Sequence, residues 1–373
     1  MVEHLIIGGG VYGAAVAWEL ASRGEACRLL EARRIGAGAS SGPGRRGVRA
    51  NGRDPRELPL IRRAMEIWPG LHERLGTEPL FERTGHIQLI EQDRDLAAAG
   101  ARVVLQNAMG VPSRLLDAGE VRELEPAVCD AVQAGILVPG DGVADHTATT
   151  RAYAAAARAA GAEIVEGVTA TAIVVEGGRA VAVETAEADR IAIAGSLIVL
   201  ANAGAQALLA PPVALPLWNL AFQVLLSKPL PEVPVNHLIG HASRRLALKG
   251  EPGNRVMISG GYVGRWDDAT GTGHPIQAEI AANVADAVAA YPALEGIEIE
   301  TADTGHLESL SPDGIPVIDR LPGAQNAFYA TAWNGHGWAI APAVAEMLAA
   351  WVAEGEKAEA LAPFEAGRFG IGR

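Results

Sequence analysis

The sequence predicts an α/β fold for its N-terminal part, joined to a second domain of α+β type. Two observations near the N-terminus indicate the first domain: a glycine-rich turn between an apolar strand and a helix, and a second strand that ends in an acid. Later segments alternate polar and apolar residues, which is typical of an antiparallel sheet. At 373 residues the chain is long enough for two domains.

The first element is the apolar run His4–Ile7, which predicts a strand. The motif Gly8-Gly-Gly-Val-Tyr-Gly13 follows it, and a helical pattern then runs through Arg23. Ala26–Leu30 predicts the second strand, directly before Glu31. The order is therefore strand, G-x-G-x-x-G, helix, strand and acid, with all the context that the motif requires.

Each glycine of this motif has a physical role. Gly8 permits a tight turn, Gly10 lets a pyrophosphate approach the backbone, and Gly13 lets the helix pack on the strand. Glu31 is placed to accept hydrogen bonds from ribose hydroxyls, and it disfavours a 2′-phosphate. The residues therefore predict FAD or NAD rather than NADP, the alternative being glycines with a purely structural role.

A glycine- and serine-rich loop follows Glu31, from residue 32 to residue 54. Loops of this length inside a compact domain are usually functional. Three later blocks, at residues 141–173, 196–208 and 310–352, supply a DG-x-x-D sequence before a helix, a strand with a small-residue turn, and a glycine-rich segment before a final helix. With this loop, they make the chain resemble the D-amino-acid oxidase superfamily of FAD-dependent oxidoreductases.

That superfamily includes glycine oxidase, monomeric sarcosine oxidase and D-amino-acid dehydrogenases, and the resemblance covers about half the chain. It implies a Rossmann-type FAD-binding domain and a substrate domain built on an antiparallel sheet. We expect FAD as the cofactor, and oxidation of a C–N bond of a small amine or amino acid to an imine by hydride transfer to flavin N5.

The expected FAD-binding domain is discontinuous, covering residues 1–80, 141–215 and 303–373. Residues 81–140 and 216–302 form the expected substrate domain. Its strands are predicted at 85–92, 222–228 and 255–266, and a helix at 276–291. Pockets favour domain interfaces, so we expect the substrate between this sheet and the flavin.

The motif and the resemblance together assign a set of cofactor-binding residues. They are Gly8, Gly10, Val11, Tyr12, Gly13, Glu31, Ala32, Arg33, Ala39, Ser40, Ser41, Arg45, Arg46, Gly47, Ala170, Ala203, Gly204, His306, Gly335, His336, Gly337 and Trp338.

Three residues are expected to act in catalysis: His336, Arg49 and Glu308. His336 lies before a helix predicted to begin near Ile340, whose first turn holds Pro342 and whose free N–H groups favour a negatively charged reduced flavin. The alternative is a histidine with a structural role only.

Arg46 and Arg49 occupy the place of an R-x-x-R sequence in monomeric sarcosine oxidase. The resemblance implies that one arginine lies near the flavin and that Arg49 binds the substrate carboxylate, a task that suits the planar guanidinium. The alternative is a solvated basic loop or a phosphate contact, and Arg45 is the weaker candidate of the three.

The chain departs from its relatives just before the sequence Ser311-Pro-Asp-Gly314, which predicts a turn. Glu308 stands where glycine oxidase has its carboxylate-binding arginine. His306 stands where monomeric sarcosine oxidase has the cysteine that carries its flavin. A cysteinyl link is excluded there, a histidyl link stays open, and FAD is expected to be non-covalent. Glu308 attracts an ammonium group or pairs with Arg46 or Arg49.

Composition narrows the function classes. Hydrophobic residues make up 49% and charged residues 20%, which excludes a disordered chain, and the net charge of −13 argues against nucleic-acid binding. Two cysteines without a CxxC sequence predict no metal site and a cytoplasmic location. No signal peptide or transmembrane segment is predicted.

Two other functions stay open at this point. One is FAD-dependent oxidation of a 2-hydroxy acid, and the other is a noncatalytic FAD-binding subunit of a larger complex. The electron acceptor is oxygen, a quinone or another carrier. The lysine that follows the G-H-G sequence in monomeric sarcosine oxidase is Ala339 here, which favours a dehydrogenase.

Overall fold

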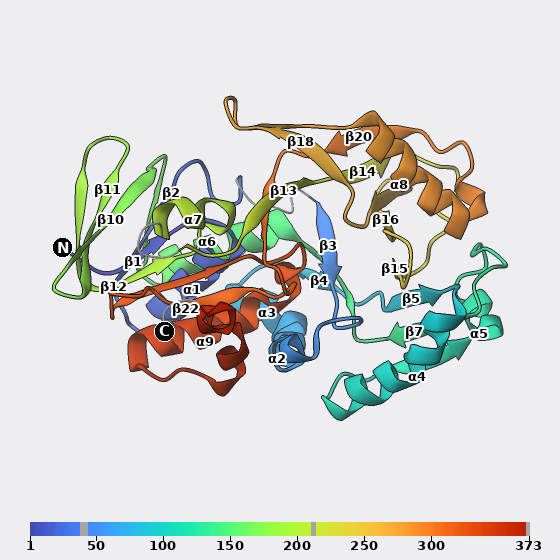
Figure 1. Ribbon diagram of the computed structural model, residues 1–373, viewed down its shortest axis with the longest axis horizontal. Helices are drawn as coiled ribbons and strands as arrows, with labels where there is room; N and C mark the ends of the chain where they lie inside the picture. The colour runs from blue at the N-terminus through green and yellow to red at the C-terminus, as the bar shows by residue number, and fades with distance from the viewer. Residues whose placement is uncertain (38–43, 210–213, 371–373) are drawn as a thin grey trace.

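A computed structural model describes residues 1–37, 44–209 and 214–370. Figure 1 shows two halves side by side, with the N-terminal sheet and its helices in one and a second sheet with its own helices in the other. No helix in the described ranges is both long enough and apolar enough to cross a bilayer.

The N-terminal half is built on an eight-stranded sheet in the order β10-β11-β12-β1-β2-β9, with β23 beside β12 and β22 beside β23. Its parallel strands are β1 (Val2–Ile7), β2 (Cys27–Glu31), β9 (Glu163–Glu166), the end of β12 (Arg190–Val199) and β23 (Ala327–Thr331). Its antiparallel strands are β10 (Ala170–Glu176), β11 (Arg179–Thr185) and β22 (Val317–Arg320).

β1 lies in the middle of this sheet, and its register sets the edge where the site forms. Ile7 pairs with Leu30 of β2 and Val199 of β12, so the carboxyl ends of three parallel strands meet. Ligands of open α/β sheets bind at such an edge.

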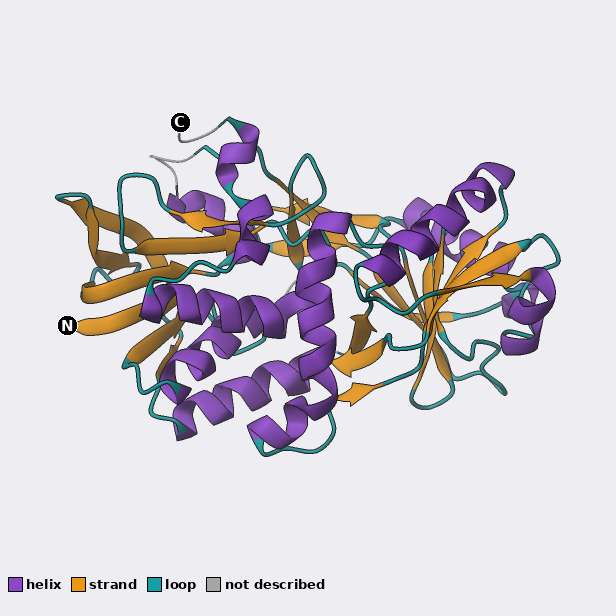
Figure 2. Ribbon diagram, turned by 90° about the horizontal axis from the view of Figure 1, so that it is seen from below, coloured by secondary structure: helices purple, strands orange, loops and turns teal. Residues whose placement is uncertain are grey.

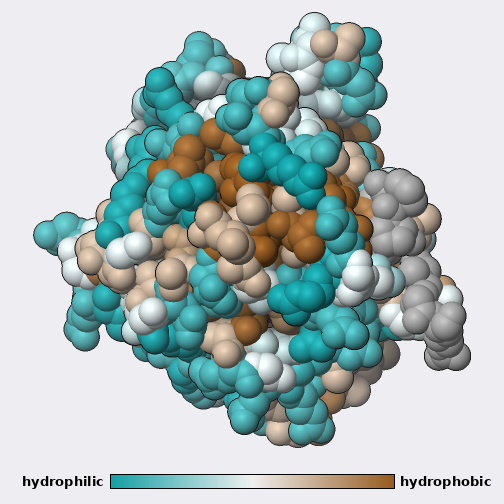
Figure 3. Space-filling model, turned by 90° about the vertical axis from the view of Figure 1, so that its left-hand side faces the viewer, coloured by the Kyte–Doolittle hydropathy of each residue, from teal (hydrophilic) through white to brown (hydrophobic). Residues whose placement is uncertain are grey.

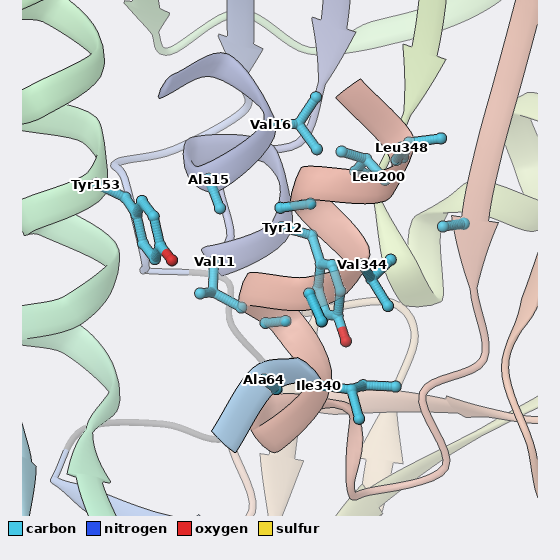
Figure 4. Close-up of a cluster of buried hydrophobic side chains, with 14 of the residues drawn as sticks. Val11, Tyr12, Ala15, Val16, Ala64, Tyr153, Leu200, Ile340, Val344 and Leu348 are labelled. Carbon is cyan, nitrogen blue, oxygen red and sulfur yellow. The ribbon is translucent and has the colours of Figure 1, made fainter. Parts of the chain in front are cut away.

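Helix α1 (Val11–Ser22) packs between α6 (His146–Ala159) and α9 (Ala341–Glu354), as the close-up in Figure 4 shows. Val11 and Val16 of α1, Tyr153 of α6 and Val344 of α9 belong to this buried cluster. α1 is rich in alanine, which lets neighbouring helices approach closely. Helices α2 (Leu58–Ile67), α3 (Leu71–Leu75) and α7 (Ala205–Leu209) complete this half, and Figure 2 shows helices gathered beside the sheet.

The second half holds another eight-stranded sheet, in the order β20-β14-β17-β16-β15-β5-β7-β6. Its strands are β5 (His86–Ile90), β6 (Arg114–Asp117), β7 (Ala134–Val138), β14 (Val224–Ser227), β15 (Leu238–His241), β16 (Ala247–Glu251), β17 (Arg255–Ser259) and β20 (Ile299–Asp303). Its helices are α4 (Asp93–Ala108), α5 (Ala118–Leu124) and α8 (Gln277–Ala290).

This half differs from the expectation in two ways. β5 and β15 pair in parallel, so the sheet is mixed rather than wholly antiparallel. The strand predicted at 255–266 is two strands, β17 and β18 (Val263–Asp267), which belong to different sheets. The break falls at Gly260 and Gly261, whose φ angles of +137° and +95° suit glycine and end the first strand.

Two small sheets lie between the halves. One has the order β3-β8-β4, from β3 (Arg45–Val48), β8 (Gly142–Asp145) and β4 (Phe81–Glu82). The other has the order β19-β18-β13-β21, from β19 (Thr272–His274), β18, β13 (Trp218–Phe222) and β21 (Leu307–Leu310). Both β3 and β13 stand at the centre of Figure 1.

The predicted fold class, α/β with an α+β second domain, is confirmed. The domain boundaries stay a prediction, which the strand pairing supports because each large sheet draws its strands from the segments assigned to one domain, apart from the edge of β20.

Figure 3 views the molecule from the end of the N-terminal sheet, where apolar side chains gather in the centre of the face between polar ones.

Candidate functional site

A cavity of about 530 Å³ opens at the carboxyl ends of β1, β2 and β12. Its walls come from residues 7–12, 30–33, 168–171, 200–204 and 305–308, together with His146, Ala207, Leu208, Trp266, Trp333, Gly335, Gly337 and Trp338. Segments that lie far apart in the sequence therefore line one continuous space.

In the glycine turn beside this cavity, each glycine of the motif has a different steric role. Gly8 has a φ of +107°, and a Cβ there would lie 2.6 Å from the Leu200 carbonyl oxygen. A Cβ on Gly13 would lie 1.8 Å from the Gly8 carbonyl oxygen. A Cβ on Gly10 meets nothing within 4 Å, so this glycine keeps space open at the start of α1, where free N–H groups favour an anion.

Glu31 is buried at the end of β2 and holds the glycine turn. One carboxylate oxygen, Oε2, accepts a hydrogen bond from the Gly9 N–H at 2.6 Å, and Oε1 accepts one from the Arg33 N–H at 2.8 Å. Each carboxylate oxygen has a second lone pair, which leaves acceptors for the hydroxyls of a ribose.

Tyr12 joins the first turn of α1 to the C-terminal segment. Its hydroxyl donates to the Gly337 carbonyl oxygen at 2.5 Å, and its ring stacks on Trp333 at a centroid distance of 3.6 Å. Burial raises the pKa of Tyr12 well above its usual value, so the hydroxyl stays protonated and remains a donor. Tyr12 thereby fixes the two segments that line the cavity.

The lining of the cavity also holds buried polar atoms without hydrogen-bond partners among the described residues: Nδ1 of His146, Nδ1 of His306 and Nε1 of Trp338. Burial, followed by the nearby Arg46, lowers the pKa of His146 to about 4. Buried polar atoms cost free energy unless they bond to something. A cavity that combines an anion site at a helix N-terminus with unsatisfied polar atoms in its lining fits FAD. His146 was not among the predicted residues, although it follows the DG-x-x-D sequence directly.

A second cavity of about 450 Å³ adjoins the first. Four arginines line it, Arg46, Arg49, Arg53 and Arg244, and so do the histidines His86, His241 and His336. Glu308, Gly335 and Trp338 line both cavities and therefore mark their junction.

Arg49 and Arg46 come from β3 and its end. Arg49 donates from Nη1 to the Asn51 carbonyl oxygen at 2.6 Å, and Arg46 donates from Nη1 to the Arg45 carbonyl oxygen at 2.8 Å. Burial lowers the pKa of each guanidinium to about 10, and the neighbouring Arg53 adds to this effect at Arg49. Both side chains remain cationic at neutral pH.

Glu308 lies on β21, opposite Leu220 of β13, and is 3% exposed. Its Oε2 accepts a hydrogen bond from Asn202 Nδ2 at 3.4 Å. The turn that follows is formed as predicted, with the Gly314 N–H donating to the Ser311 carbonyl oxygen and a φ of +73° at Gly314.

His336 lies against two charged residues that the sequence did not single out, Arg53 and Glu57. Arg53 Nη1 is 2.6 Å from His336 Nδ1, and Glu57 Oε1 is 3.3 Å from the same nitrogen. Arg53 Nε also donates to the Arg49 carbonyl oxygen at 3.0 Å. Arg53 and His336 are 283 positions apart in the sequence, so no local pattern indicates this contact.

The predicted cofactor residues fall into four groups. Those that line the first cavity are Gly8, Gly10, Val11, Tyr12, Glu31, Ala32, Arg33, Ala170, Ala203, Gly204, His306, Gly335, Gly337 and Trp338. Arg46, Gly47 and His336 line only the second cavity, and Gly13 lies inside α1 and lines neither. Ala39, Ser40 and Ser41 lie outside the described residues.

Arg45 does not lie where a cofactor-binding residue is expected, and its contacts explain its position. Its guanidinium donates to Glu251 at 3.0 Å and to Glu82 at 2.5 Å, and it lines neither cavity. Its position gives no support to the expected contact with the cofactor, because side chains alternate along β3 and Arg45 points to the other face.

Comparisons with known proteins agree with this geometry. The model of the family described as FAD dependent oxidoreductase matches residues 3–351. Sarcosine oxidase subunit beta of Arthrobacter sp is 24% identical over 380 residues, covering 99% of this chain and 91% of the relative. Glycine oxidase of Geobacillus kaustophilus is 32% identical over 168 residues, covering 43% of this chain and 45% of the relative.

Solved structures match over the whole chain. The structure of L-proline dehydrogenase from P. horikoshii has a TM-score of 0.89 at 25% identity, covering 100% of this chain and 98% of that one. The structure of glycine oxidase from Geobacillus kaustophilus has a TM-score of 0.85 at 23% identity, covering 98% of both chains.

Proposed function

Since the chain belongs to the family of FAD-dependent oxidoreductases, with FAD as its cofactor, we propose that it oxidises a small amine that carries a carboxylate. The bond oxidised is C–N, and the product is an imine. The relatives reported above are named for sarcosine, glycine and L-proline, which supports an amino acid as the substrate class.

One observation carries the proposal: the distribution of charge over the two cavities. The acid Glu308 lines the junction, whereas Arg46 and Arg49 line only the second cavity. An amino acid held with its nitrogen towards Glu308 and its carboxylate towards Arg49 meets opposite charge at both ends. This orientation brings the carbon that bears the nitrogen to the junction.

When bound, FAD would supply the acceptor for the hydride on that carbon, while the nitrogen lone pair would form the C=N bond. In our proposal, Arg49 orients the carboxylate and Glu308 attracts the amine. The amine must lose its proton before the C=N bond forms, so the rate rises with pH as the free base accumulates. The imine then hydrolyses in water and releases ammonia or an amine.

Residues around the first cavity bear on how FAD is held. The described lining includes no cysteine, and its histidines His146 and His306 offer ring nitrogens. We propose non-covalent binding, with Glu31 at the ribose and Gly10 at the pyrophosphate. Acid treatment followed by filtration checks this proposal, because a covalent flavin would stay with the precipitated protein.

Product analysis during turnover tests the reaction class. Purified holoenzyme is supplied with an artificial electron acceptor and with matched pairs of an amino acid and its 2-hydroxy analogue. We expect ammonia or an amine to be released, at a rate that rises with pH. Turnover of the hydroxy acid alone would assign the chain to the 2-hydroxy-acid class. If no substrate is turned over and a partner protein co-purifies with the chain, its role is noncatalytic.

The electron acceptor is a separate question, for which oxygen and a quinone are the candidates. The described linings of the two cavities include no lysine. We propose a dehydrogenase that passes electrons to a quinone or another carrier. Rapid reoxidation of the reduced enzyme by air would contradict this part.

A further inference from the structure

Arg53, Glu57 and His336 form a cluster in the wall of the second cavity, which the reaction described above does not use. Arg53 is 3% exposed and Glu57 is 1% exposed. The side chain of His336 is more accessible, at 23%, and lines the cavity. The accessible imidazole of His336 therefore contacts two buried charged side chains, those of Arg53 and Glu57.

The chemistry of the donor set fixes the state of the imidazole. Arg53 Nη1 lies 2.6 Å from His336 Nδ1, which is within hydrogen-bond distance. A guanidinium can only donate hydrogen bonds. Nδ1 must therefore accept, and the ring proton must sit on Nε2.

Glu57 competes for the same nitrogen. Its Oε1 lies 3.3 Å from His336 Nδ1, and a hydrogen bond there would require a proton on Nδ1. The two contacts exclude each other. The contact with Arg53 is shorter, and Glu57 Oε1 accepts no hydrogen bond among the described residues. Burial and then Arg53 lower the pKa of His336, whereas the contact with Glu57 raises it, and the net lowering agrees with the first arrangement.

We propose that Arg53 is a positioning residue that holds His336 as a neutral imidazole, with Nε2–H presented to the second cavity as a fixed hydrogen-bond donor. Among the described residues, Nε2 makes no hydrogen bond that would occupy this proton. The natural partner is the anionic group of the substrate, an assignment that rests on the proposed function.

Arg53 also connects the two groups that would meet this anion. The same guanidinium donates from Nε to the carbonyl oxygen of Arg49 and from Nη1 to His336. The charged groups around the imidazole are Arg49 at the end of β3, and Arg53, Asp54 and Glu57 before α2. Glu308 lines the same cavity from β21. Arg53 therefore positions both the Nε2–H donor of His336 and the backbone at Arg49.

The proposal predicts a specific switch when Arg53 is removed. In Arg53→Met, Glu57 becomes the nearest partner of Nδ1, so the proton moves to Nδ1 and the pKa of His336 rises. In the double variant Arg53→Met/Glu57→Gln, the carboxylate that contacts Nδ1 is also gone, so burial and Arg49 keep His336 neutral. Arg53→Lys keeps a donor and a cation, so we expect it to retain the wild-type state.

Nitrogen-15 NMR of histidine-labelled, ligand-free protein tests the proposal, with the His336 signals identified by their loss in His336→Gln. We expect an unprotonated Nδ1 and a protonated Nε2 in the wild type, with no titration between about pH 6 and 8. A protonated Nδ1 in the wild type would overturn the proposal. Because this result needs no variant, the proposal can be tested even if Arg53→Met does not fold.

The pH profile of kcat/KM gives a second measurement. We expect a new ionisation between about pH 6 and 8 in Arg53→Met that is absent from the wild type and from the double variant. The same profile in all three proteins would contradict the positioning role. Because the NMR measurement needs no substrate, a failure of the proposed function leaves its result intact, and the two failures are distinguishable.

Discussion

At the scale of single residues, Glu308 and Arg49 show how the site separates opposite charges. Glu308 comes from β21 and borders both cavities, whereas Arg49 comes from the end of β3 and borders one. The amino-acid composition of the chain predicts the place of neither residue. The resemblance to a family indicated both residues, and the fold places them around one space.

Glu308→Gln removes the negative charge at the junction and keeps the shape of the side chain. We expect amine ligands, whose nitrogen meets Glu308 in the proposed orientation, to bind roughly tenfold or more weakly, because a charge-assisted contact contributes about 1.5–3 kcal/mol. Carboxylate ligands of the same size that lack a nitrogen should change much less. Binding measurements on such a matched pair check this, and equal changes for both ligands would exclude a cation site at Glu308.

Arg49→Met removes the proposed partner of the substrate carboxylate. We expect KM for carboxylate substrates to rise roughly 10- to 100-fold, because a hydrogen bond between charged groups is lost. Arg94→Met is the control, since Arg94 is 78% exposed on α4 and lines neither cavity. If both variants keep the wild-type KM, the carboxylate binds elsewhere.

At the scale of elements, the turn between β1 and α1 was predictable because its chemistry is local. The strand, the three glycines and the acid all lie within 31 residues. The contacts that complete the site are not local. Tyr12 and Gly337 are separated by 325 residues, and only the packing of α1 against α9 brings them together. The break at Gly260 was missed because alternation continues on both sides of it.

The three glycines predict different outcomes for the same substitution. Gly10→Ala meets no protein atom, so the apoprotein should keep its stability while FAD binds roughly tenfold or more weakly. Gly8→Ala should lower the stability of the apoprotein itself, because φ is +107° and the new Cβ meets the Leu200 carbonyl. Thermal unfolding of the apoprotein and flavin titration separate the two effects.

Gly100→Ala in α4 is the matched control. It has open space around it, and alanine should stabilise the helix by about 0.5–1 kcal/mol without changing FAD binding. If Gly10→Ala binds FAD as the wild type does, the pyrophosphate does not pass over this turn.

At the scale of the whole molecule, Asp141 ties the second sheet to the site loop. It lies between β7 and β8, and its carboxylate accepts hydrogen bonds from the Ala50 N–H at 2.8 Å and the Asn51 N–H at 3.1 Å. Burial raises the pKa of Asp141 to about 7, against the opposing effect of these two donors. The folded state therefore binds this proton more tightly than the unfolded chain does.

This shift has a defined sign. A carboxyl whose pKa is raised on folding contributes stability at low pH, and the contribution is lost as the pH rises through about 7. The free energy of unfolding of the wild type, relative to Asp141→Asn, should therefore fall between about pH 4 and 7 and level off above that range. Urea unfolding at several pH values measures this difference, and a difference that grows with pH would show that Asp141 is ionised throughout.

The global arrangement could be predicted only in part. The fold class followed from the order of the segments and the family resemblance, and the expected antiparallel sheet contains one parallel pair because β5 and β15 come from distant segments. Arg53 and Glu57 carried no signal in the sequence, since neither belongs to the motifs. The cytoplasmic location stays a prediction.

In the proposed reaction, the oxidised bond is the C–N bond of an amine that carries a carboxylate. Anaerobic bleaching of the flavin absorption tests it most directly, because reduction by substrate is observed without any electron acceptor. The panel holds D- and L-amino acids, N-methyl amino acids, polyamines and 2-hydroxy acids. We expect bleaching by at least one amino acid or N-methyl amino acid and none by its hydroxy analogue, whereas bleaching by hydroxy acids alone would show that the C–N bond is not the bond oxidised.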